Sequence, residues 1–417
     1  MQKPRRYQPM LTSSEVTRRE FVRAGAASAV VGGIVLGVPS FAASDQDRTP
    51  PPAPETNIND FMKVPKGKHA LPGPFPGRVV EVKDARSLAD DAVDGKVVAE
   101  MFERGVRTLT GKDMSQSFAL LFEPGDVVGI KVNPVGPPLI HTKVELAQAV
   151  VRWLMDNKVP AGRIVIWDRF DYMLKEAGYT PDRFPKGVRI EGLQTMDETG
   201  NGWRDAAGNH VSTDRFDKDA YYFAKGIVGR NVRGYKNDEF YLNQHVFNGE
   251  YSYFGKLLTK DVTRLVNLAA YKNTGAGISM ATKNLGYGAV CNTGRLHAPL
   301  FFTVCTEVLA APAVREKLVL NVIDGLRGQY DGGPDKNAQF VYPNHSLYFA
   351  TDPFALDMCC HRQLMAKRKE MGIAVNEHPR FTEYLHYAER LGLGVANPEK
   401  IDYVRVQGPE TGSWAGR

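Results

Sequence analysis

Lysine, asparagine, histidine and aspartate residues follow several short apolar runs of this sequence, where they could bind and transform a small anion. Lys131 and Asn133 end one run, and His141 lies in the loop after it. Other runs end at or near Asp168, Lys272 and Asp324. Because ligands of open α/β sheets collect outside the carboxyl ends of the strands, we predict that these residues converge on one site. The alternative for a single aspartate is that it caps a helix or fixes a turn.

A second group of polar residues lies between positions 283 and 297. Lys283 and Asn284 are followed by Arg295 and His297. These ammonium, amide, guanidinium and imidazole groups suit an anionic substrate, although the glycines among them would equally serve as helix ends. We predict catalytic roles for Lys131, Lys283, His297 and Asp324, and binding roles for Asn133, His141, Asp168, Lys272, Asn284 and Arg295.

A candidate metal site consists of Asp352, Asp357 and His361. Asp352 precedes Pro353, which is a strong signal for the start of a helix. Asp357 and His361 then lie four residues apart on one face of that helix, where a carboxylate and an imidazole could share Mg²⁺, Mn²⁺, Fe²⁺ or Zn²⁺. The alternative is a local hydrogen bond between the two side chains. The sequence does not identify the cofactor.

Several familiar catalytic motifs are missing. The sequence contains no G-x-x-x-x-G-K-[ST] loop, no H-E-x-x-H, no G-x-S-x-G and no G-x-G-x-x-G after a strand. P-loop hydrolysis, zincin-type proteolysis and serine nucleophiles are therefore disfavoured. The four cysteines form no C-x-x-C pair, and we expect buried thiols, with a disulfide between Cys291 and Cys305 as the alternative.

The apolar patterns around these residues predict an α/β fold with a mostly parallel sheet flanked by helices. An apolar run at 126–133, a helical pattern at 144–157 and a second run at 163–168 have the spacing of a parallel crossover. Further strands are expected at 78–82, 262–268, 318–323 and 346–350, and further helices at 96–109, 300–309 and 353–371. Residues 195–255 form an irregular aromatic-rich insertion, which either lines a pocket or packs on itself.

Residues 1–42 have the three parts of a twin-arginine targeting signal. Arg18 and Arg19 are followed by Phe21, then by an apolar stretch at 24–38 and small residues at 40–42. A retained N-terminal anchor is the competing interpretation. The signal predicts a periplasmic or otherwise exported protein, with the twin-arginine translocase as a transient partner and no stable membrane span after cleavage.

The remainder of the chain is close to neutral. The formal charge is +6, and residues 1–42 hold six Lys or Arg against two Asp or Glu, which leaves +2. No basic stripe of the kind that binds nucleic acid is present. We predict a proline-rich tether at 43–76, without packed elements, and a single α/β domain at 77–410.

The chain resembles the family known as domain of unknown function 362. The resemblance rests on motifs that keep the family's order over roughly residues 120–365. They are Gly-Ile-Lys-Val-Asn at 129–133, Leu-Val-Asn at 265–267, Lys-Asn at 272–273, Lys-Asn-Leu-Gly at 283–286, Arg-Leu-His at 295–297, Val-Ile-Asp-Gly at 322–325 and Thr-Asp-Pro-Phe-Ala-Leu-Asp at 351–357. The resemblance implies a shared α/β core with a polar site, and no established reaction. Some members add ferredoxin-like cysteine clusters, and because this sequence has none, an iron–sulfur cluster is not expected.

These observations predict an exported enzyme or cofactor-binding protein that acts on a small anionic substrate. The alternative is a periplasmic ligand-binding protein, or an accessory protein of a redox complex, that uses the same cationic residues without catalysis. A small-molecule ligand is expected in both cases.

Overall fold

The computed structural model describes residues 54–89, 92–194, 215–228, 249–275, 277–297, 300–375 and 381–409. The predicted targeting signal at 1–42 lies outside the described residues, as does much of the predicted insertion. Within the described part of the chain, no helix is both long enough and apolar enough to cross a membrane.

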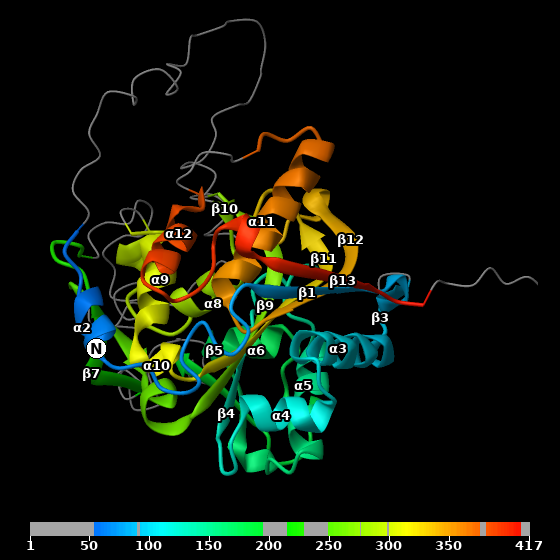
Figure 1. Cartoon of the computed structure of the whole chain (residues 1–417), viewed down its shortest axis with the longest axis horizontal. Helices are drawn as coiled ribbons and strands as arrows, with labels where there is room; N and C mark the ends of the chain where they lie inside the picture. The colour runs from blue at the N-terminus through cyan, green and yellow to red at the C-terminus, as the bar shows by residue number, and fades with distance from the viewer. Residues whose placement is uncertain are drawn as a thin grey trace, which may run out of the picture.

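A sheet of nine strands forms the centre of the described structure (Figure 1). Its order is β13-β1-β12-β11-β9-β4-β5-β6, and β10 pairs with β9. The strands are β1 (Arg78–Lys83), β4 (Val128–Lys131), β5 (Ile164–Phe170), β6 (Arg189–Gln194), β9 (Arg264–Thr274), β10 (Gly277–Ile278), β11 (Leu318–Gln329), β12 (Val341–Ala350) and β13 (Asp402–Gln407). Within this sheet β10 and β12 run against the other strands. The predicted mostly parallel sheet is thus confirmed.

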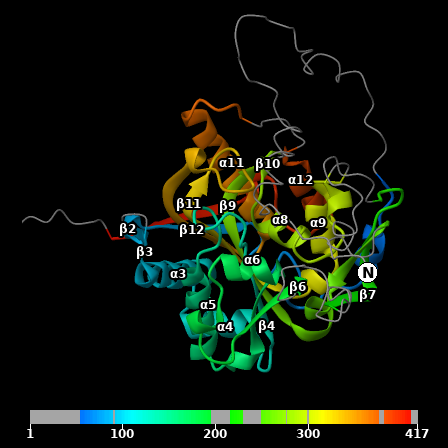
Figure 2. The ribbon, with the colours of Figure 1, turned by 180° about the vertical axis from the view of Figure 1, so that it is seen from behind.

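Helices cover both faces of the sheet, as Figures 1 and 2 show from opposite sides. They are α2 (Ile58–Lys63), α3 (Gly95–Thr110), α4 (Met114–Leu121), α5 (Val144–Asp156), α6 (Asp171–Glu176), α8 (Ala281–Gly286), α9 (Thr303–Ala310), α10 (Pro312–Arg315), α11 (Pro353–Glu370) and α12 (Glu383–Arg390). Alternation along each strand divides the core between the faces. In β5, Ile164 and Ile166 pack with the residues of α3 and α5, whereas Val165 and Trp167 pack with those of α8 and α9.

The predicted crossover is present as β4, α5 and β5. The parallel register aligns Val128 with Ile164 and Lys131 with Trp167. Helix α5 buries an apolar stripe, including Leu146 and Val150, against this part of the sheet. The unit therefore fixes Lys131 and the carboxyl end of β5 side by side.

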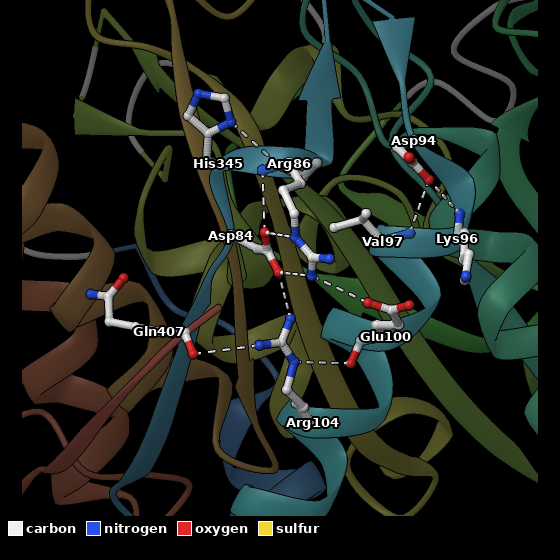
Figure 3. A network of polar contacts seen from close by, with 10 residues as sticks. Asp84, Arg86, Asp94, Lys96, Val97, Glu100, Arg104, His345 and Gln407 are labelled. Carbon is white, nitrogen blue, oxygen red and sulfur yellow. Dashed lines mark hydrogen bonds and ion pairs between the residues drawn. The ribbon is translucent and has the colours of Figure 1, made fainter. Parts of the chain in front are cut away.

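A buried aspartate joins the end of β1 to α3 (Figure 3). Asp84 accepts hydrogen bonds from the guanidinium groups of Arg86 and Arg104, with its Oδ2 at 2.8 and 2.7 Å from their Nη2 atoms. Burial alone would raise the pKa of Asp84, but these bonds and the Arg86 amide outweigh it and lower the pKa to about 2. Asp94 caps the start of α3 through the amides of Lys96 and Val97.

The described part of the predicted tether, residues 54–76, is packed against the domain, so the prediction is wrong for these residues. They contain α2, and Leu71 is fully buried. The guanidinium group of Arg315 donates to the backbone carbonyls of Phe61 and Val64, at 3.0 and 2.8 Å. An arginine from a distant part of the chain thus anchors the segment by its backbone, a contact that sequence pattern could not reveal.

The described part of the predicted insertion contains an antiparallel hairpin of β7 (Phe216–Phe223) and β8 (Tyr251–Gly255). Tyr222 is buried, whereas Tyr221 and Tyr251 are exposed and in edge-to-face contact with each other. A second small hairpin pairs β2 (Leu88–Ala89) with β3 (Ala92–Val93). The insertion thus has regular structure that its sequence did not indicate.

Candidate functional site

The candidate site lies where strand order reverses. The chain passes from β4 to β5 on one side, while β9, which also pairs with β4, leads to β11 on the other side. Ligands of open α/β sheets bind outside the carboxyl ends of the strands at such a switch point. Five of the predicted residues meet there, and we call them the polar cluster: Lys131, Asn133, Asp168, Lys272 and Asn284.

Lys131 has all three ammonium hydrogens engaged inside the protein. Its Nζ donates to the Asp168 carboxylate, to Asn284 Oδ1 at 3.0 Å and to the Val132 carbonyl at 2.7 Å. Burial lowers the pKa of Lys131, and the Asp168 charge opposes that shift. Gly288 leaves room for the lysine, since a Cβ there would overlap Lys131 Cε and the Asn284 carbonyl. Lys131 therefore holds the cluster together and has no donor left for a ligand.

A chain of asparagine amides crosses the edge of the sheet to reach the cluster. Asn321 Nδ2 donates to the Thr351 carbonyl, and Asn267 Nδ2 donates to Asn321 Oδ1 at 2.9 Å. Asn284 Nδ2 donates in turn to Asn267 Oδ1 at 2.8 Å, and Asn284 Oδ1 accepts from Asn133 Nδ2 at 3.1 Å. Because every link is buried and satisfied, the orientation of each amide is determined by its neighbours.

Lys272 ends the amide chain. Its Nζ donates to Asn133 Oδ1 at 3.0 Å and to the Val135 carbonyl at 2.9 Å, and within the described residues its third N–H has no acceptor. Burial, followed by the charge of Lys283, lowers the pKa of Lys272 to about 7. Lys272 is thus partly protonated at pH 7, and its ammonium form has one N–H without an acceptor among the described residues.

Lys283 is partly exposed and lies among aromatic rings. Its Nζ is 4.9 Å from the ring centre of Tyr287 and 5.4 Å from that of Phe301. No residue that the structure describes accepts a hydrogen bond from this ammonium group or forms an ion pair with it. Burial lowers its pKa. Lys283 therefore keeps all its donors for a ligand.

His297 stands beside Lys283 with one ring nitrogen available. Its Nδ1 is 2.9 Å from the Thr293 carbonyl, and because a carbonyl can only accept, Nδ1 carries the proton. The ring contacts Tyr287 and Phe301, with centres 4.7 and 5.6 Å away, and its edge is open to solvent. Desolvation by the surrounding protein and the Lys283 charge lower the pKa of His297 to about 4. The imidazole is therefore neutral at pH 7, with a lone pair on Nε2.

His141 and Asp324 lie next to the polar cluster but form their hydrogen bonds outside it. Asp324 accepts hydrogen bonds from the amides of Lys143, at 2.7 Å, and Leu326, at 3.2 Å. Burial raises the pKa of Asp324 to about 6. Burial and then the charges of Lys143 and Lys272 lower the pKa of His141 to about 3. Asp324 thus has the capping role named as the alternative to catalysis, and His141 adds a neutral imidazole to a cationic region.

Arg295 lies away from the polar cluster, in a short 3-10 helix (Gly294–Leu296) that contacts the β7–β8 hairpin. Its guanidinium group donates to Ser252 Oγ and to the carbonyls of Tyr222 and Ile227, at 3.0–3.2 Å. These contacts hold the hairpin against the domain. The structure thus gives Arg295 a positioning role at the insertion.

The three predicted metal ligands are engaged differently. Asp352 accepts hydrogen bonds from four backbone amides, of which two lie at the start of α11 and two belong to Gly77 and Val395. Asp357 accepts the amides of Ala281 and Thr282 and so caps α8 from α11. His361 is buried, and its Nε2 has no hydrogen-bond partner. Among the described residues, no group of three His, Cys, Asp or Glu side chains could hold a metal ion. A divalent metal therefore stays a prediction.

Two parts of the site escaped the sequence reasoning. Gly288 was noted only as a possible helix end, and the aromatic contacts of Lys283 with Tyr287 and Phe301 were not expected. An aromatic residue four positions after a lysine in a helical pattern is the signal that could have indicated the contact with Tyr287. A surface groove of 510 Å³ lies elsewhere, between α3 and α5, and contains none of the predicted residues.

The model of a family described as Domain of unknown function (DUF362) matches residues 231–362. This segment is similar to the DUF362 family. The resemblance inferred from the sequence motifs is thus confirmed, and the DUF362 segment contains Lys272, Lys283 and His297, while Lys131 and Asn133 precede it. Neither the curated proteins nor the solved structures gave a significant match.

Proposed function

We propose that this protein is an exported enzyme that binds a small anionic substrate between Lys272 and Lys283 and moves a proton through His297. One observation carries the proposal: two buried or half-buried lysines keep free N–H donors beside a neutral imidazole whose Nε2 is free. Nearby Asp168 is already bonded to Lys131. An anion would supply the negative charge that this part of the site lacks.

The proposed chemistry follows from the donor inventory. Lys283 and the third N–H of Lys272 would bind the carboxylate or phosphoryl oxygens of the substrate and stabilise negative charge that develops during the reaction. His297 Nε2 would accept a proton as a general base, because the Thr293 carbonyl fixes the tautomer. Export is supported by residues 1–42, which have the pattern of a twin-arginine signal.

Anion binding can be tested by isothermal titration calorimetry with inorganic phosphate and with oxalate at pH 7. The full-length protein should bind at least one of them, and Lys283→Met should weaken binding about tenfold, equivalent to about 1.4 kcal/mol. Lys367→Met is the matched control, because Lys367 also lies over an aromatic ring, 5.0 Å from the centre of Tyr342, but pairs with Glu370 at 2.6 Å. Absence of binding, or equal weakening in both variants, would contradict the proposal.

The second candidate function is a binding or accessory protein without catalysis. The observation that favours it is the exposed aromatic surface of the β7–β8 hairpin, where Tyr221 and Tyr251 are 38% and 39% exposed and could contact a partner. His297→Gln separates the two functions. If His297 serves only binding contacts, the variant should change affinity for phosphate or oxalate, whereas a general base should be needed for turnover and dispensable for affinity.

A further inference from the structure

Lys283 differs from the other lysines of the site in what surrounds its nitrogen. Lys131 donates to three protein acceptors and Lys272 to two. Among the described residues, Lys283 Nζ lies over the rings of Tyr287 and Phe301, and no carboxylate there pairs with it. Its side chain is also partly open to solvent, whereas Lys131 and Lys272 are buried. Lys283 is thus the most exposed lysine of this site.

The surroundings of Lys283 favour the free amine. Burial removes water from the ammonium group and lowers the pKa of Lys283, as it does for lysines that act as nucleophiles. The neighbouring Lys272 is also cationic when protonated and disfavours a second charge. His297, with its free Nε2, lies against the same two rings as the amine. A free amine beside a base is the arrangement needed for attack on a carbonyl carbon.

We propose that Lys283 forms an imine with an aldehyde or ketone that carries an anionic group. This inference rests on the proposed function, because the anionic group would bind the free N–H of Lys272. The substrate class is therefore an oxo acid or a phosphorylated carbonyl compound.

The reaction balances without a redox partner. The lone pair of Lys283 Nζ forms a bond to the carbonyl carbon, and the π electrons move to the oxygen, which takes up a proton from solvent, so that the imine formed at the end is protonated on nitrogen. His297 Nε2 accepts the proton released from nitrogen and returns it to the departing hydroxyl group. Water leaves, and a carbon–nitrogen double bond remains. The imine can then withdraw electrons from the neighbouring carbon.

The inference can be tested with pyridoxal phosphate, an aldehyde that carries a phosphate, followed by reduction with borohydride. Hydride addition to the imine carbon makes the link permanent, and peptide mass spectrometry then locates it. Trypsin does not cut after a labelled lysine, so label on Lys283 appears in the peptide 273–295 and label on Lys367 appears in the peptide 363–368. The full-length protein should carry its label mainly on 273–295 when the probe is substoichiometric.

The variant Lys283→Arg keeps the charge and the ring contacts but cannot form an imine. It should lose the label on 273–295, whereas Lys367→Arg should keep it. Equal labelling of the two peptides in the unaltered protein would overturn the inference, and this result does not depend on whether a variant folds.

The alcohol analogue pyridoxine phosphate separates the inference from the proposed function. It should compete with the label and bind in calorimetry, because it retains the phosphate. If it binds while pyridoxal phosphate gives no reducible adduct on Lys283, the imine is refuted and anion binding stands. If neither compound binds, both the inference and the proposed function fail.

Discussion

Replacing Lys131 by methionine should strongly destabilise the protein, because it leaves the Asp168 carboxylate buried without its cation. The two side chains are 2% and 9% exposed, and Lys131 Nζ is the cation that pairs with Asp168 in the described residues. Methionine fills a similar volume, so the cavity term is small. Removing one partner of a buried ion pair costs about 3–5 kcal/mol, and that is the loss expected in the free energy of unfolding.

The double variant Lys131→Met with Asp168→Leu should recover part of this loss. It removes both charges and leaves no unpaired carboxylate, although the Val132 carbonyl still loses a hydrogen bond worth about 1 kcal/mol. Asn284 Oδ1 keeps its bond from Asn133 Nδ2 in both variants. The double variant should therefore be more stable than the single one by at least about 1 kcal/mol.

Urea unfolding at pH 7, followed by circular dichroism, measures these differences. The control is Lys367→Met, which breaks a pair whose Glu370 side chain is 65% exposed and should cost less than about 1 kcal/mol. If Lys131→Met costs no more than the control, or if the double variant is no more stable than the single one, Lys131 does not hold the site in the way described.

Two further predictions concern close packing and pH. Gly288→Ala should destabilise the protein by about 1–3 kcal/mol and weaken phosphate binding, because the new Cβ overlaps Lys131 Cε. Gly162→Ala is the control, since a Cβ there has nothing within 4 Å, and it should change neither quantity. Urea unfolding measures the stability and calorimetry measures the binding. Asp84→Asn should cost about 2 kcal/mol at pH 7, since the pKa of Asp84 is lowered from 3.8 to about 2 by the network in Figure 3. A carboxylate whose pKa is lowered by folding stabilises the folded protein at pH values above its unfolded-state pKa. This stabilisation is lost as the pH falls through the folded-state pKa. The cost should therefore disappear between about pH 4 and pH 2, and a constant cost over that range would refute this reasoning.

Local patterns predicted much of the fold. The runs at 126–133 and 163–168, with the helical stripe between them, became β4, α5 and β5. Such patterns succeed because burial of one face imposes the period of the element on its apolar residues. The convergence of Lys131, Asn133, Asp168 and Lys272 also followed from sequence, because carboxyl ends of parallel strands share one edge of a sheet.

Contacts between distant segments decided what the patterns left open. Asp352 and Asp357 were predicted as metal ligands from their spacing, yet their oxygens accept backbone amides from other parts of the chain. The segment 54–76 was predicted as a tether, yet Arg315 binds its carbonyls. In each case the deciding partner lies far away in the sequence, where periodicity carries no information.

The sequence by itself determined the order and type of the central elements and the edge of the sheet where the polar side chains gather. The tertiary structure alone decided which of those side chains remain free for a ligand. The Lys131 ammonium group is engaged by Asp168 and Asn284, which lie 37 and 153 positions away, whereas in the described part of the chain Lys283 contacts aromatic rings and no acceptor. A donor is free or engaged according to the acceptors within hydrogen-bond reach, and folding, not sequence spacing, brings those acceptors into place.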